Sequence, residues 1–183
     1  NPDFKDAIGL KGAVLLQLGR LEEARPWLEK CLADPIDRLE ALRLLGTLAA
    51  RQERYPEACF HFTELWEAGV HTRDLAHAWM EAATASGSLP AVNKVYGLAV
   101  AEWPLDLGLR VDWAVVLSGL GETMAALDQI TYVVERDPAS PRAFFVLGDL
   151  FLAAGEFGQA ASSYELALRY QPDYAQGWFV YGN

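Results

Sequence analysis

The chain has 183 residues, of which 52% are apolar and 22% charged, a balance typical of a folded soluble protein rather than of a disordered acidic tail. Its 25 acidic residues outnumber 15 basic ones, and this net charge of -10 argues against nucleic acid as a partner, because nucleic-acid binders present a basic face. No apolar stretch approaches the roughly 18 residues of a membrane-spanning helix, so no membrane insertion is expected.

The sequence gives little information on compartment or redox chemistry. The two cysteines, Cys31 and Cys59, are too few for a disulfide scaffold, and no Cys/His cluster has zinc-ligand spacing. The first residues lack the basic-then-apolar order of a secretory signal, but a fragment of a longer chain would have lost that segment. The cytoplasm and the periplasm therefore both stay open, and no cofactor is implied.

A period of 34 residues runs through the chain without insertion or deletion. It is visible first in Leu45-Gly46 and Leu147-Gly148, which are three periods apart. The frame that begins at Lys5 gives five full repeats and the start of a sixth. These cover residues 5–38, 39–72, 73–106, 107–140, 141–174 and, in part, 175–183. We expect residues 1–183 to form one domain built from them.

Each repeat carries two amphipathic helical segments. Places 4, 7, 8 and 11 of the repeat have the spacing of one helix face, and places 20, 24, 27 and 28 have it again. These places are almost all apolar or glycine, with small residues at most of places 8 and 20, and the only charged residues there are Lys11 and Arg110. We expect the long stems of these two side chains to lie along apolar surface while the charges reach water.

Turn residues separate the two predicted helices of each repeat. Place 15, where the first helix should end, is glycine in four repeats (Gly19, Gly87, Gly121 and Gly155), and a residue that tolerates positive φ is useful there. Glu53 holds this place in the second repeat, which predicts a different or strained turn. Place 32 is proline in later repeats, whereas Ile36 and Val70 depart from that pattern.

Other prolines fit the same division. Pro56 and Pro90 fall in the expected first turn of a second helix, where the missing N–H costs nothing. Ser140-Pro141 reads as an N-cap followed by a first-turn proline. Pro26 should lie inside the second helix of the first repeat and bend it locally.

A 34-residue helix-turn-helix unit with a small residue at place 8, Ala at place 20 and Pro at place 32 resembles the tetratricopeptide repeat family. The resemblance covers essentially the whole chain and is strongest in residues 141–174. It implies an all-α fold, a right-handed superhelix of helix pairs, whose first helices line a concave groove. It also implies a non-catalytic scaffold that binds a protein or peptide segment there.

By this resemblance the groove is lined mainly by places 2, 5, 6, 9, 12 and 13 of each repeat. The candidate binding residues are Arg43, Thr47, Arg51, His77, Glu81, Val111, Val115, Ser118, Phe145, Asp149 and Leu152. We expect a segment with an apolar anchor and basic flanks to dock at the fourth and fifth repeats. Lys and Asn residues that grip chaperone carboxylates in some members are not matched in three successive repeats, so that partner is not expected.

Two other functions stay open at this stage. The chain could be a structural spacer in a bacterial secretion or exopolysaccharide-export assembly, where an exposed tryptophan would stack on a sugar. It could also be the regulatory or targeting arm of an enzyme outside this segment. A metal site at His71, Asp74, His77 and Glu81 is geometrically conceivable, but a solvated helix face is the favoured interpretation, and no metal is assigned.

The ends of the sequence carry one more expectation. The stretch from Gln176 to Tyr181 resembles a first helix that expects a second helix beside it. We therefore expect the parent protein to continue in both directions, and this segment to associate with itself through its uncapped C-terminal end.

Overall fold

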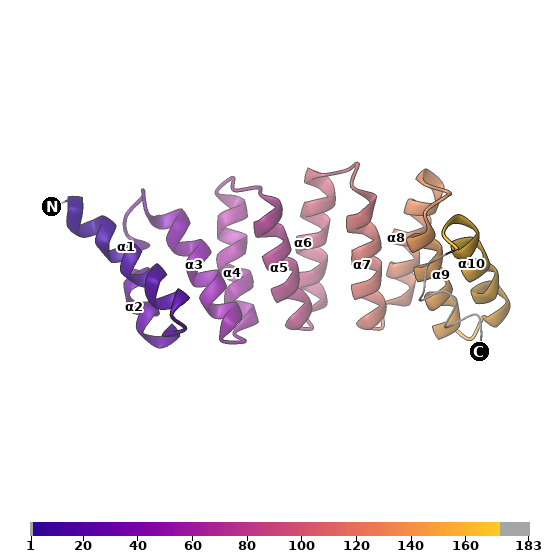
Figure 1. Cartoon of the computed structure of the whole chain (residues 1–183), viewed down its shortest axis with the longest axis horizontal. Helices are drawn as coiled ribbons and strands as arrows, with labels where there is room; N and C mark the ends of the chain where they lie inside the picture. The colour runs from indigo at the N-terminus through magenta and orange to yellow at the C-terminus, as the bar shows by residue number, and fades with distance from the viewer. Residues whose placement is uncertain (1, 173–183) are drawn as a thin grey trace. The chain divides into compact units, whose positions relative to one another are not determined.

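The computed structural model describes residues 2–172, with side chains from Gly9 onward, and within that range the chain is helical with no strand (Figure 1). The predicted sixth repeat, with Trp178 and Phe179, lies outside the described residues. The helices are α1 (Pro2–Gln17), α2 (Leu21–Cys31), α3 (Arg38–Arg51), α4 (Tyr55–Glu67), α5 (Arg73–Ala85), α6 (Leu89–Glu102), α7 (Leu107–Gly119), α8 (Thr123–Arg136), α9 (Pro141–Ala153) and α10 (Phe157–Tyr170).

The chain divides into two compact units. Unit 1, Asn1–Val95, contains α1 to α5 and the first half of α6; unit 2, Tyr96–Asn183, contains the rest. Within unit 1, α1 packs on α2 and α3 on α4, and α3 also lies against α5. Within unit 2, α7 packs on α8 and α9 on α10. The assignment of residues 1–183 to a single domain stays a prediction.

The second helix of every pair begins 34 residues after the previous one. These starts are Leu21, Tyr55, Leu89, Thr123 and Phe157. Three of these helices end two residues before the place-32 prolines, because a proline and the residue before it do not continue a helix. The predicted period of helix pairs is therefore confirmed within the described residues.

The core follows the predicted places. Of those with described side chains, only Lys11 is exposed, and its Nζ lies 3.8 Å from the centre of the Trp27 ring. Arg110 is half-buried, with its guanidinium carbon 3.7 Å from the centre of the Tyr132 ring. Both charges thus rest on aromatic faces, where the ring quadrupole attracts a cation, rather than simply reaching water.

The two helices of a pair cross where a small residue faces a large one. A Cβ atom added to Gly148 of α9 would lie 2.5 Å from Cε1 of Tyr164 on α10. A Cβ added to Gly12 of α1 would lie 2.6 Å from Cδ2 of Leu28 on α2. At Gly12 and Gly148 the glycine is thus favoured by the packing of the partner helix rather than by backbone conformation.

The turns confirm the predicted glycine places and explain the exception. The four glycines at place 15 have φ between 64° and 82°. Glu53 adopts a φ of 59° and is the non-glycine residue with positive φ in the described chain, so its turn keeps the same geometry and is strained. Pro26 does lie inside α2, and Ser140 caps α9 by accepting a hydrogen bond from the Ala143 N–H at 3.4 Å.

The strain at Glu53 can be measured directly. Glu53→Gly should raise the free energy of unfolding by about 0.5–1 kcal/mol, because removing the left-handed penalty outweighs the extra entropy of glycine in the unfolded chain. Urea denaturation of the purified protein measures this difference. Glu53→Ala is the control, since it removes the carboxylate but keeps the strain; an equal gain with alanine would contradict the prediction.

The helix crossing gives a second prediction. Gly148→Ala should lower the free energy of unfolding by about 1–2 kcal/mol, because overpacking against Tyr164 exceeds the benefit of alanine in a helix. Gly158→Ala is the matched control, since a Cβ there meets no atom within 4 Å. Its stability should stay equal or rise by about 0.5 kcal/mol. Equal losses for both variants in thermal or urea unfolding would show that the crossing is not close-packed.

Candidate functional site

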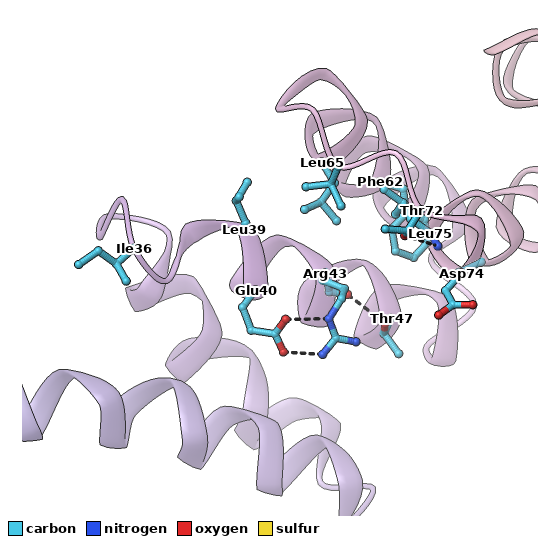
Figure 2. A pocket seen from close by; sticks show the side chains of 12 residues that line it. Ile36, Leu39, Glu40, Arg43, Thr47, Phe62, Leu65, Thr72, Asp74 and Leu75 are labelled. Atoms are coloured by element: carbon cyan, nitrogen blue, oxygen red, sulfur yellow. Dashed lines mark hydrogen bonds and ion pairs between the residues drawn. The ribbon is translucent and has the colours of Figure 1, made fainter. Parts of the chain in front are cut away.

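A pocket of about 580 Å³ opens within unit 1 between α3 and α5, with α4 behind them (Figure 2). Its walls combine apolar and polar side chains. The lining residues are Ile36, Leu39, Glu40, Arg43, Thr47, Phe62, Leu65, Val70, Thr72, Asp74, Leu75 and Ala78. The volume falls within the roughly 300–1,000 Å³ of small-ligand and side-chain pockets.

Helical spacing places the polar lining on two facing helices. Glu40, Arg43 and Thr47 stand at i, i+3 and i+7 on α3, and therefore share one of its faces. Asp74 and Ala78 stand one turn apart on α5. The floor is apolar, since Phe62 and Leu65 of α4 are 1% and 2% exposed. The pocket is thus a polar-rimmed depression over the hydrophobic core.

Two loops complete the pocket, and each departs from the proline pattern of the later repeats. Ile36 precedes α3 on a turn in which its N–H donates to Asp34 Oδ1 at 3.0 Å, and its side chain is 90% exposed. Val70 follows Gly69, which ends α4 with a φ of 90°. The Val70 N–H donates to the Leu65 carbonyl at 3.1 Å and so closes the helix end.

The charged rim is largely satisfied internally. Arg43 donates two hydrogen bonds to the Glu40 carboxylate, one from Nε at 2.7 Å and one from Nη2, and this pairing raises the pKa of Arg43. Thr47 Oγ1 donates to the Arg43 carbonyl at 2.9 Å. Asp74, in the first turn of α5, has no hydrogen bond or ion pair through its side chain within the described part of the chain.

The pocket brings together only some of the predicted binding residues of unit 1. Arg43 and Thr47 line it, whereas Arg51, His77 and Glu81 do not. Arg51 Nη1 donates to the Leu16 carbonyl at 2.7 Å, which satisfies the C-terminal end of α1. His77 Nδ1 lies 3.5 Å from Glu81 Oε1 on the exposed face of α5.

In unit 2, the predicted surface of α7 and α9 is divided between exposed and packed side chains. Val115 and Leu152 are 47% and 41% exposed, and Ser118 is half-buried. Val111 is only 2% exposed, so its side chain packs in the core, and its role in partner binding stays a prediction.

Phe145 and Asp149 are engaged with Tyr164. The ring of half-buried Phe145 lies 5.4 Å from that of Tyr164, centre to centre. The Tyr164 hydroxyl donates to Asp149 Oδ1 at 2.7 Å. Burial raises the pKa of the Asp149 carboxyl, and the hydrogen bond from Tyr164 only partly offsets this rise. Substitution of either residue would therefore disturb packing as well as any surface.

The four residues of the conceivable metal site do not form one. The His71 ring stacks on Trp66 at 4.5 Å, His77 faces Glu81, and Asp74 lines the pocket. Among residues 2–172, no group of three or more His, Cys, Asp and Glu side chains is arranged to hold a metal ion. The five tryptophans in that range are buried or half-buried. None of the described helices has the length and apolar character needed to cross a bilayer.

Sequence reasoning missed a polar cluster that joins α2 to α4 in unit 1. Arg25 of α2 donates from Nη1 to Glu57 Oε1 at 2.5 Å and from Nη2 to Gln52 Oε1 at 2.6 Å. His61, 9% exposed, has its Nε2 3.9 Å from the same Glu57 oxygen. His61 Nδ1 and Arg25 Nε are buried with no hydrogen-bond partner among the described atoms.

Burial and charge act in opposite directions in this cluster. Burial lowers the pKa of His61; the carboxylates of Glu57, Glu64 and Glu29 oppose the shift, while Arg25 adds to it. Burial alone would raise the pKa of Glu57, but the hydrogen bond and charge of Arg25, with smaller contributions from Arg54 and His61, lower it. These two pKa shifts therefore favour a neutral His61 beside an ionised Glu57.

Helix pairs repeated every 34 residues define a helical repeat protein of the solenoid class. Two family models, both described as Tetratricopeptide repeat, match the sequence, one at residues 111–175 and 146–183 and the other at residues 6–33. Together they cover more than half of the chain, which belongs to the tetratricopeptide repeat family.

Solved structures agree on the fold. YrrB, described as a TPR protein with an unusual peptide-binding site, is 22% identical with a TM-score of 0.65, covering 94% of this chain and 89% of its own. MamA is 15% identical with a TM-score of 0.70 and 96% coverage of both chains. A tetratricopeptide repeat protein from Parabacteroides merdae is 18% identical with a TM-score of 0.54, covering 96% and 68%. No curated protein sequence gives a significant match.

The cluster predicts how stability depends on pH. Because the folded-state pKa of His61 lies below its ordinary 6.5, the unfolded chain binds more protons as pH falls through that value, and the free energy of unfolding should decrease. A second decrease should begin near pH 4.5, where the unfolded Glu57 carboxyl takes up a proton before the folded one does. Urea denaturation at pH steps between 8 and about 4 measures both.

His61→Leu should flatten the decrease that begins near pH 6.5 and leave the lower one, because the leucine does not titrate. His77→Leu is the control at an exposed position and should keep both decreases, since His61 is intact. A wild-type pH dependence that survives in His61→Leu would assign the effect to other groups.

Proposed function

We propose that this chain is a non-catalytic protein-interaction scaffold, and that the pocket between α3 and α5 receives an apolar side chain of a partner protein. The supporting observation is the pocket itself, with a buried floor at Phe62 and Leu65 and a polar rim at Glu40, Arg43 and Thr47. A buried apolar anchor inside a polar rim is the usual energetic centre of a protein interface.

The choice of ligand rests on the chemistry of the lining. The pocket walls include the apolar side chains of Leu39, Val70 and Leu75, so an apolar side chain that packs on them gains roughly 25 cal/mol for each Å² removed from water. The rim supplies donors and acceptors for the main chain that carries the anchor. YrrB is described as having a peptide-binding site, but at 22% identity this supports only the fold for the present chain.

The exposed side chains of Val115 and Leu152 in unit 2 form a second proposed contact surface, with Ser118 and Asp149 on the same two helices. It retains the anchor expected at the fourth and fifth repeats but without Val111, which is buried. A structural spacer in a secretion or exopolysaccharide-export assembly is the alternative role, and an arm of an enzyme elsewhere is another. Under either alternative role, neither the pocket nor the unit 2 surface should bind a partner protein.

A capture experiment with matched variants tests the pocket. Leu39→Asp places a charge in the apolar wall at a position that is 40% exposed and near the start of α3, where an acidic residue is compatible with the helix. It should weaken partner binding by about tenfold or more, the value of one buried apolar side chain. Leu18→Asp makes the same change at a 66% exposed position outside the pocket and should bind normally.

Affinity capture from the source cells, quantified by mass spectrometry, gives the readout once circular dichroism confirms that each variant is folded. A protein retained by the wild type and Leu18→Asp but lost with Leu39→Asp supports the pocket. Loss only in a Val115→Asp/Leu152→Asp variant would move the site to unit 2. Phe145 is avoided because it packs on Tyr164. Identical capture by all variants, or none by any, would reject both surfaces and favour the spacer.

A further inference from the structure

The pocket is poorly suited to a carboxylate, although an arginine lines it. One edge of the Arg43 guanidinium, formed by Nε and Nη2, is already occupied by the Glu40 carboxylate. The pair carries no net charge, and an incoming carboxylate would meet the negative charge of Glu40 as well as the positive charge of Arg43. The remaining N–H groups of Arg43 suit a neutral acceptor, such as a main-chain carbonyl.

Asp74 is the charge in the pocket that is left without an opposite partner. It lines the cavity from the first turn of α5, and no described side chain pairs with it. The neighbouring Arg73 does not line the pocket. A ligand therefore meets one acidic group whose charge the pocket walls do not neutralise.

Two apolar lining residues lie at the opposite end of the pocket from Asp74, although Leu75, next to Asp74 on α5, also lines it. Figure 2 shows Ile36 and Leu39 at one end, beside the start of α3, and Asp74 at the other, on α5. The Glu40–Arg43 pair lies between them. An extended segment that enters beside Ile36 and Leu39 would thus pass the Glu40–Arg43 pair before it reaches the carboxylate of Asp74.

We infer, on the basis of the proposed function, that the occupant is an internal stretch of a partner protein in which an apolar anchor is accompanied by a nearby Lys or Arg that pairs with Asp74. The anchor fills the end near Ile36 and Leu39, its main chain passes the Arg43 N–H groups, and the cation reaches Asp74. An acidic segment is disfavoured, because it would face Asp74 and compete with Glu40 for Arg43.

Synthetic peptides test this charge preference without knowledge of the natural partner. The probes are capped alanine peptides with one Leu and one Lys, separated by one to four alanines in either order, and matched sets with Gln or Glu in place of Lys. Titration of the ¹⁵N-labelled protein, followed by NMR shifts of pocket residues such as Thr47 and Ala78, gives dissociation constants in the millimolar range.

The best Lys peptide should bind roughly two- to fivefold more tightly than its Gln counterpart, the range of an exposed ion pair, and the Glu peptide most weakly. Asp74→Asn should remove this order while leaving shifts at the pocket, and 0.5 M salt should reduce it. Glu81→Gln, which changes another acid of α5 outside the pocket, should keep the order.

The experiment distinguishes failure of the charge inference from failure of the proposed function. Equal affinity for Lys, Gln and Glu peptides, or a preference that persists in Asp74→Asn, would overturn the charge inference while the pocket remains a docking site. If no peptide shifts the pocket residues at millimolar concentration, or if Leu39→Asp binds as the wild type does, the pocket itself is not the docking site and the proposed function fails.

Discussion

The structure depends on how closely the two helices of each pair approach. Second-helix residues at place 20, such as Ala58 and Ala126, are fully buried. In the pair formed by α9 and α10, Gly148 leaves no room for a Cβ atom against Tyr164. With the backbones so near, a large second-helix side chain, such as Leu28 or Tyr164, packs over the first-helix glycine and buries apolar area that a single helix would leave exposed. The same contact fixes which face of each first helix turns away from its partner. That outward face carries Arg43 and Thr47, so the packing constraint and the location of the pocket have one origin.

The fold was predictable because this constraint recurs. Few residue types fit a crossing or a left-handed turn, and the recurrence of small residues every 34 positions is visible in the sequence before any helix is drawn. Even Glu53, the one substitution at a glycine turn, adopts the same backbone conformation, because the helices on either side determine the turn. The tertiary contacts of the repeat thus override the preference of Glu53 for negative φ and leave its backbone strained.

The candidate site was less predictable, since it arises where the repeats differ. Ile36 and Val70 were visible only as departures from the proline pattern, yet both line the pocket. Losing proline at these places lets an Asx turn project Ile36 and a glycine-terminated helix end position Val70. The burial of Val111, one of the groove positions carried over from the family, was not visible either, because whether a residue at the margin of a helix face is covered depends on side chains that no periodicity specifies. The Arg25–Glu57–His61 cluster was missed for a related reason: Arg25 lies 32 residues before Glu57 in the sequence, and no motif links it to Glu57 and His61.

Charge adds a final constraint on what this pocket can recognise. The protein is acidic overall, but net charge says little about one depression in its surface, where pairing decides which groups remain available. Arg43 would count as a cation in any sequence-based inventory, and the structure removes it from that role by placing Glu40 one turn away. Asp74 differs from Glu40, the other acidic residue of the pocket, because no described side chain pairs with it. Selectivity here would come from the one charge left unpaired, while the apolar floor supplies most of the affinity.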